Sequence, residues 1–112
     1  MQTLLRSALL APCAVLMLAP AAPAAPAAVA KVVIGNFTFG PPVLVVKPGT
    51  TVTWVNGDDI PHTVVADDKK TFRSKVLDTD DAFSFTFTTP GSYAYFCSIH
   101  PHMTGKVVVK AS

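Results

Sequence analysis

Residues 82–110 read AFSFTFTTPGSYAYFCSIHPHMTGKVVVK, and this stretch decides the fold. Its first part, residues 83–87, alternates Phe with Ser and Thr, which is the period of a strand with one face in the core. A Thr-Pro-Gly-Ser turn leads into a second β-rich run at 93–97, and a Val-rich run follows at 105–110. Short strands separated by turn residues indicate an all-β fold.

The residues before this stretch continue the pattern of short β-rich runs broken by Gly, Pro and Asn. The further strands that we expect are residues 31–34, 37–39, 43–46, 51–56 and 62–66. Between two of them, Lys47-Pro48-Gly49-Thr50 has Pro and Gly at the centre of a type II turn, which predicts a hairpin. The polar segment 67–81 is expected to be an irregular excursion. Regularly spaced short strands predict a β-sandwich or small barrel.

The first thirty residues have the composition of a secretory signal peptide. One positive charge, on Arg6, precedes an almost wholly apolar run at 7–18, which is too short to span a bilayer. An Ala/Pro-rich segment follows and ends in a small-x-small motif. We therefore expect a leader at 1–30 and a single domain at 31–112, of 112 − 30 = 82 residues, exported to the periplasm or another oxidising compartment.

Charge points to neither nucleic acid nor an anionic membrane. The chain has nine Lys+Arg and seven Asp+Glu. Removing Arg6 with the leader leaves eight against seven, a net charge of +1, which is no electrostatic footprint for a polyanion. We interpret the acidic pairs as charges that solvate loops, and only secondarily as docking charges: Asp58-Asp59, Asp67-Asp68 and Asp80-Asp81.

Cys97 is the only cysteine left once Cys13 departs with the leader. An exported domain of this size often carries disulfides, and this one has no internal partner for its thiol. A metal bond would protect it. The alternative for a lone cysteine is a small buried hydrophobe.

Metal ligands cluster around that cysteine. Cys97, His100 and Met103 follow one another at intervals of three residues in a single loop, and the other two methionines lie in the leader. Outside the loop His62 is the only histidine, and Pro61 before it limits local motion. Two His, one Cys and a weak axial Met form the ligand set of an electron-transfer copper site.

Three segments carry a resemblance to a known family. They are Thr51–Asn56, Ile60–Val64 and Tyr93–Val109, and they resemble the cupredoxins, with the short Cys-x-x-His-x-x-Met loop of the amicyanin branch. The resemblance implies a Greek-key β-sandwich and one type 1 copper ion. It also implies that His62, Cys97 and His100 are the strong ligands and Met103 the axial one. One-electron transfer between Cu(I) and Cu(II) is the function it implies.

One residue departs from the family pattern. The family usually has Asn directly after the first histidine, where its side chain ties the two ligand loops together, and this chain has Thr63. We expect Thr63 to offer its backbone N–H to the Cys97 sulfur and its hydroxyl to Ser98.

Several side chains near the motif have simpler interpretations. Met103 alone is also compatible with core packing, and His102 is interpreted as a solvated surface histidine. Trp54 and the Phe83, Phe85, Phe87 stripe are predicted to be core. Phe96 is interpreted as a packing or surface aromatic, and secondarily as an electron route beside the copper.

Competing functions come from two other classes. An enzyme is disfavoured, because three histidines are too few for a multicopper oxidase and no base–nucleophile arrangement stands out. An exported protein for copper storage, delivery or tolerance would use the same ligands without a redox cycle, and zinc could replace copper. For the electron carrier we expect a monomer with transient redox partners, such as a dehydrogenase, cytochrome or oxidase.

Overall fold

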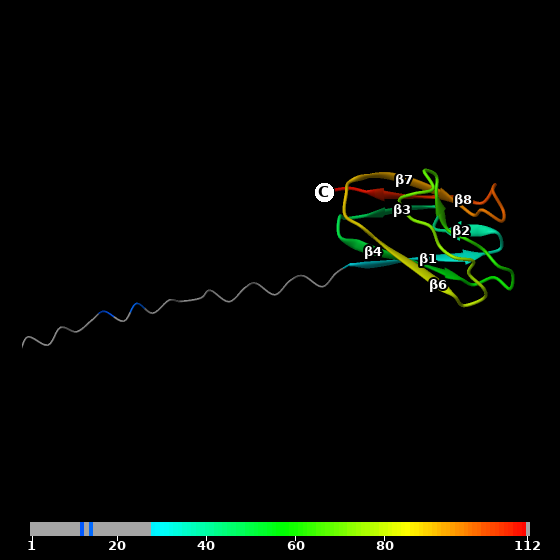
Figure 1. The fold of residues 1–112 in the computed structure, drawn as a ribbon, viewed down its shortest axis with the longest axis horizontal. Coiled ribbons are helices and arrows are strands. Elements are labelled where there is room, and N and C mark those ends of the chain that lie inside the picture. The colour runs from blue at the N-terminus through cyan, green and yellow to red at the C-terminus, as the bar shows by residue number, and fades with distance from the viewer. Residues whose placement is uncertain (1–11, 13, 15–27, 112) are drawn as a thin grey trace, which may run out of the picture.

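The structure is a computed structural model that describes residues 12, 14 and 28–111. The predicted leader, residues 1–30, lies almost entirely outside the described residues. Within 28–111 the chain forms eight strands, in two four-stranded sheets, and no helix (Figure 1). Among the described residues, no helix is long and apolar enough to cross a membrane.

Each sheet combines parallel and antiparallel pairs. The first has the order β2-β1-β4-β6, with bounds Thr38–Gly40, Val29–Gly35, Thr50–Asn56 and Ala82–Phe87. The second has the order β3-β8-β7-β5, with bounds Val43–Val46, Thr104–Val109, Gly91–Phe96 and Val65–Ala66. β1 runs parallel to β4 and β3 runs parallel to β8, while the remaining pairs are antiparallel. The predicted all-β sandwich is confirmed.

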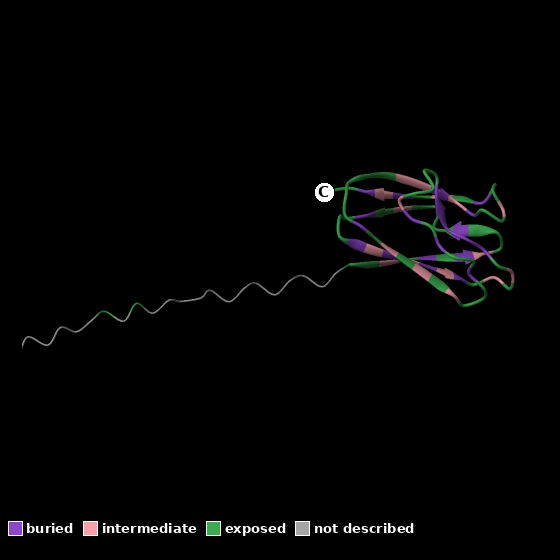
Figure 2. Cartoon of the chain, viewed as in Figure 1, coloured by how far each residue is buried: buried purple, intermediate pink, exposed green. Residues whose placement is uncertain are grey.

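The core lies between the two sheets and is built around Trp54, which is fully buried. Along β4, buried residues alternate with half-buried ones, as the strand period requires (Figure 2). Of the predicted Phe stripe, Phe87 is buried, and Phe83 and Phe85 are half-buried against the core. Trp54 packs against aromatic rings from both sheets and from the β5–β6 connection: Phe72, Phe83, Phe87 and Tyr95. The core prediction for these residues is confirmed.

The turn at Lys47–Thr50 has the predicted geometry but does not close a hairpin. Gly49 has φ of 89°, as the third residue of a type II turn requires, and the Thr50 N–H donates to the Lys47 carbonyl at 3.2 Å. However, β3 pairs with β8 in one sheet and β4 pairs with β1 and β6 in the other. The hairpin prediction is wrong, because this turn carries the chain from one sheet to the other.

Three connections meet at one end of the sandwich, away from the C-terminus (Figure 1). They are the β1–β2 turn, the β4–β5 loop and the β7–β8 loop. Asp58, in the β4–β5 loop, accepts two N–H groups of the β1–β2 turn. Cys97, in the β7–β8 loop, accepts the N–H of Thr63 in the β4–β5 loop through its sulfur. Both predicted ligand loops therefore lie at the same end. The predicted excursion 67–81 contains no strand in the structure.

Candidate metal centre

Cys97 directly follows β7 and points into the interior, where it is fully buried and free. The β7–β8 loop folds back on itself after it. The Cys97 N–H donates to the Met103 carbonyl at 3.0 Å, and the Met103 N–H donates to the His100 carbonyl at 2.9 Å. These backbone bonds make the loop from Cys97 to Met103 a closed, tight unit.

His62 is held on both sides of its backbone. Its N–H donates to the Leu77 carbonyl at 3.0 Å, and its carbonyl accepts the Leu77 N–H at 2.8 Å. The side chain is fully buried. The expected strand at 62–66 is shorter in the structure, since only Val65–Ala66 pairs as a strand and His62 forms an isolated bridge. The bridge to Leu77 fixes the His62 backbone from the neighbouring connection.

Three of the four predicted ligands converge. The ligand atoms of His62, Cys97 and His100 all lie within 4.8 Å of one another. Both imidazoles turn Nδ1 toward the Cys97 Sγ, each at 3.8 Å. Bonds as long as those of zinc, about 2.3 Å to sulfur and about 2.0 Å to nitrogen, would place these atoms about 3.7 Å apart in the trigonal arrangement of a His2Cys site. The three donor atoms therefore fit one metal ion between them, and their chemistry is that of a type 1 copper site.

Met103 and His102 follow His100 on the same loop but differ in burial. Met103 is buried, as an axial ligand would be, and its role as a ligand stays a prediction. His102 is exposed and lies outside the three-residue cluster, so its interpretation as a surface histidine is confirmed.

Hydrogen bonds to the sulfur favour the thiolate that a metal needs. The Thr63 N–H donates to the Cys97 Sγ at 3.3 Å. Burial raises the pKa of Cys97, but the backbone hydrogen bond from Thr63 and the contacts with the His62 and His100 rings outweigh burial and lower that pKa to about 6. A thiol with this pKa is largely ionised at neutral pH, and a thiolate is the metal-binding form of cysteine.

Thr63 ties the two ligand loops together. Its hydroxyl lies 2.7 Å from the Ser98 Oγ and accepts the Ser98 N–H at 2.8 Å, and it also approaches the Cys97 Sγ at 3.7 Å. Both contacts that we expected of this residue, to Cys97 and to Ser98, are confirmed. A threonine thus supplies a link between the loops at the position where the family usually has asparagine.

We expect Thr63→Val to destabilise the protein by about 1–3 kcal/mol, because the Ser98 N–H and hydroxyl lose the buried Thr63 hydroxyl as their partner. Urea unfolding of the metal-free protein measures it. Thr53→Val is the matched control, since it removes a hydroxyl pair with Ser84 on the exposed face of β4 and is expected to cost less than about 0.5 kcal/mol. Equal losses in the two variants would contradict a special role for Thr63.

Asp58 has a role that the sequence analysis missed. Its Oδ2 lies 2.7 Å from the His62 Nε2, on the side of the ring away from the sulfur. The Asn36 N–H beside this carboxylate, helped by His62 and Phe37, lowers the pKa of Asp58. An ionised carboxylate only accepts, so Nε2 carries the proton and Nδ1 keeps its lone pair free for a metal. The interpretation of Asp58 as a loop-solvating charge is therefore wrong.

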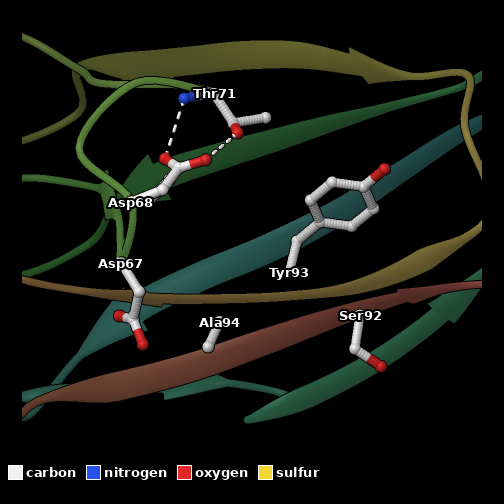
Figure 3. A pocket seen from close by; sticks show the side chains of 7 residues that line it. Asp67, Asp68, Thr71, Ser92, Tyr93 and Ala94 are labelled. Carbon is white, nitrogen blue, oxygen red and sulfur yellow. Dashed lines mark hydrogen bonds between the residues drawn. The ribbon is translucent and has the colours of Figure 1, made fainter.

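A shallow pocket elsewhere on the molecule holds none of the predicted ligands. It lies between β7 and the connection after β5, and its lining includes Asp68, Thr71 and Tyr93 (Figure 3). The Thr71 hydroxyl and N–H both donate to the Asp68 carboxylate, and these bonds lower the pKa of Asp68 to about 2. The Asp68 carboxylate therefore accepts hydrogen bonds within its own turn, which agrees with its interpretation as a loop charge.

Known proteins match this chain in sequence and in fold. The profile of the family described as "Copper binding proteins, plastocyanin/azurin family" matches residues 26–110. An amicyanin of Paracoccus versutus is 44% identical over 75 residues, a match that covers 62% of this chain and 55% of that protein. An amicyanin of Paracoccus denitrificans is 41% identical over 81 residues, covering 69% and 62%.

Among solved structures, a purple cupredoxin from Nitrosopumilus maritimus is similar with a TM-score of 0.67 and 35% identity. That match covers 72% of this chain and 99% of the other. By contrast, the chain spans 55% and 62% of the lengths of the two amicyanins. The comparisons and the three convergent donors agree on one type 1 copper ion.

Proposed function

Because the chain belongs to the plastocyanin/azurin family of copper-binding proteins, we propose that it is an exported one-electron carrier. Its copper ligands are His62, Cys97, His100 and Met103. The observation that carries this proposal is the convergence of two imidazole Nδ1 atoms on one buried thiolate. When bound, copper would supply the chemistry of taking up and releasing a single electron.

The scaffold supports this role by keeping the donors still. His62 is fixed by Leu77 through its backbone, and Cys97 is fixed by Met103. Thr63 connects the two loops. Donors that hardly move between oxidation states keep the reorganisation energy of electron transfer small, because Cu(I) and Cu(II) favour different geometries. This rigidity suits an electron carrier better than a copper donor, whose ligands must open to release the ion.

His100 is the proposed exit for the electron. It is half-buried, whereas His62 and Cys97 are fully buried. Its neighbours in the loop are apolar and exposed: Ile99, with 43% of its surface accessible, and Pro101. A small apolar rim around a partly accessible ligand suits a transient partner, which must bind and leave quickly. We propose a redox protein such as a dehydrogenase, cytochrome or oxidase.

We expect Met103→Leu to keep copper bound but to raise the reduction potential by roughly 60 mV or more, a tenfold shift toward Cu(I). Leu fills a similar volume and removes a weak donor that favours Cu(II) over Cu(I). Voltammetry of the two copper-loaded proteins measures the shift. An unchanged potential would show that Met103 only packs.

Storage or delivery of copper is the alternative function, and electron exchange separates it from the proposal. The copper-loaded protein is mixed with small one-electron oxidants and reductants in stopped flow, in the presence of a copper chelator. A carrier cycles many times without losing metal. A protein that loses its copper to the chelator within a few cycles would be a donor instead.

We also propose that residues 1–30 are a cleaved leader, that 31–112 form the mature domain, and that it works as a monomer in the periplasm or a similar compartment. The support is the charge and the apolar run of the first eighteen residues. Lys31 is the third residue of β1, so a cut after Ala30 would leave this strand with five residues, Lys31–Gly35. Mass spectrometry of the secreted protein locates the cut.

A further inference from the structure

Phe37 occupies a turn position that usually belongs to glycine. The turn between β1 and β2 has two central residues, Asn36 and Phe37, with φ of 50° and 59°. Positive φ at both positions matches a type I′ hairpin turn, where Asn-Gly is the favoured pair. In this region the side chain of any larger residue crowds its own backbone. A phenylalanine kept in such a conformation points to a use for its ring.

The Phe37 ring contacts both imidazoles of the metal centre. Its centroid lies 5.9 Å from that of His62 and 5.1 Å from that of His100, with interplanar angles of 88° in both pairs. This edge-on arrangement is favourable for aromatic rings. The ring keeps 52% of its surface accessible, so it meets the two histidines on one side and solvent on the other. It also lines a shallow groove together with Met103.

One carboxylate ties this turn to His62. The Asn36 N–H donates to the Asp58 Oδ1 at 2.7 Å, and the Phe37 N–H donates to Oδ2 at 3.2 Å. The same Oδ2 lies 2.7 Å from the His62 Nε2. Only 15% of the Asp58 side chain is accessible. The orientation of the His62 ring and the position of Phe37 are therefore set by a single group.

We propose that Asp58 and Phe37 act as one positioning unit for the metal centre. Asp58 directs the His62 Nδ1 toward the metal and holds the strained turn, and the turn places the Phe37 ring against both imidazoles. The ring limits their rotation and keeps water from their outer edges. This inference rests on the proposed copper site. Its tests therefore begin with wild-type protein that binds copper, and a wild type that does not would refute the proposed function instead.

The first test is Phe37→Gly, which removes the ring and relieves the turn. We expect the metal-free variant to be as stable as the wild type or more stable, because glycine adopts positive φ without strain. Copper transfer to a chelator should become about five times faster or more, as the loss of two edge-on contacts implies. Unchanged copper release, or a less stable metal-free protein, would overturn the role of Phe37.

The second test compares Asp58→Asn with Asp59→Asn. Both remove one negative charge, but Asp59 is exposed and only Asp58 bonds to His62. We expect Asp58→Asn to weaken copper affinity by about 10- to 100-fold and to shift the His62 Nε2–H resonance in NMR of the Cu(I) protein. Asp59→Asn should change the copper affinity by less than about twofold and leave the His62 Nε2–H resonance where it is. Equal effects in the two variants would show that charge alone matters and would overturn the proposal.

The double variant of Phe37→Gly and Asp58→Asn tests whether the two residues form one unit. Because Asp58 acts partly by holding the turn, the double variant should release copper more slowly than the product of the two single effects predicts. A release rate equal to the product of the two single effects would mean that the residues act independently, which would refute a single unit.

Discussion

Cys97→Ser is expected to abolish the intense visible absorption of the copper-loaded protein and to reduce its electron exchange by about 100-fold or more. The absorption arises from the bond between a thiolate and Cu(II), and Cys97 is the only thiol in the described centre. Serine is slightly smaller and its hydroxyl does not ionise at neutral pH. The two imidazoles remain, so weak copper binding without strong colour should persist. Absorption and electron paramagnetic resonance spectra measure the change.

The fold of this variant is expected to survive. In the wild type the Thr63 N–H donates to the Cys97 sulfur, and in the variant the serine hydroxyl can accept the same N–H. If this buried hydroxyl is poorly satisfied, the free energy of unfolding falls by about 1–3 kcal/mol. Fluorescence of the buried Trp54 reports whether the core is intact. His102→Ala is the control on the same loop and should keep full colour, because His102 is exposed and outside the cluster. A blue Cys97→Ser protein would refute the assignment of Cys97.

Removal of copper is expected to lower the free energy of unfolding by about 4 kcal/mol, relative to protein with free copper at a thousandfold excess over its Kd. Copper joins His62 to a loop that begins 35 residues later, and the unfolded chain has no such site. For a domain of about this size, the melting temperature should fall by roughly 20 °C. Calorimetry of both forms at matched protein concentration measures it.

The Cys97→Ser protein is the internal control for this experiment. Its melting temperature should change far less on copper addition, because its site lacks the strongest ligand. Identical melting curves for the wild type with and without copper would contradict a site formed only in the native state.

The sequence was most informative where chemistry and spacing coincide. The only Cys and Met after residue 30 lie in one seven-residue loop, and His62 is the only histidine outside it. Those facts sufficed to predict that Cys97, His100 and His62 converge, which the structure bears out. Alternation along residues 83–87 likewise identified a core-facing strand. Arguments from residue type and spacing can therefore identify metal ligands and the inward face of a strand.

Features that depend on how distant parts of the chain pack together could not be predicted from the sequence. The turn at Gly49 was predicted correctly. A local pattern cannot say whether the strand after a turn stays in the same sheet, and here β4 lies in the other sheet from β3. The bond from Asp58 to His62 depends on the loop between them and on the β1–β2 turn. An acidic residue four positions before the predicted histidine ligand was the available signal. Gly35-Asn36 indicated a break between two strands, but Phe37 was expected in the second strand and lies in the turn instead, because the glycine usual at its position is missing.

The most direct test of the account is the visible absorption spectrum of the purified protein, titrated with Cu(II) and then with a reductant. We expect an intense blue band that saturates at one copper per chain, disappears on one-electron reduction and returns on re-oxidation. A protein that takes up copper without an intense band, or that needs more than one copper to develop it, would contradict a single thiolate–copper centre at Cys97.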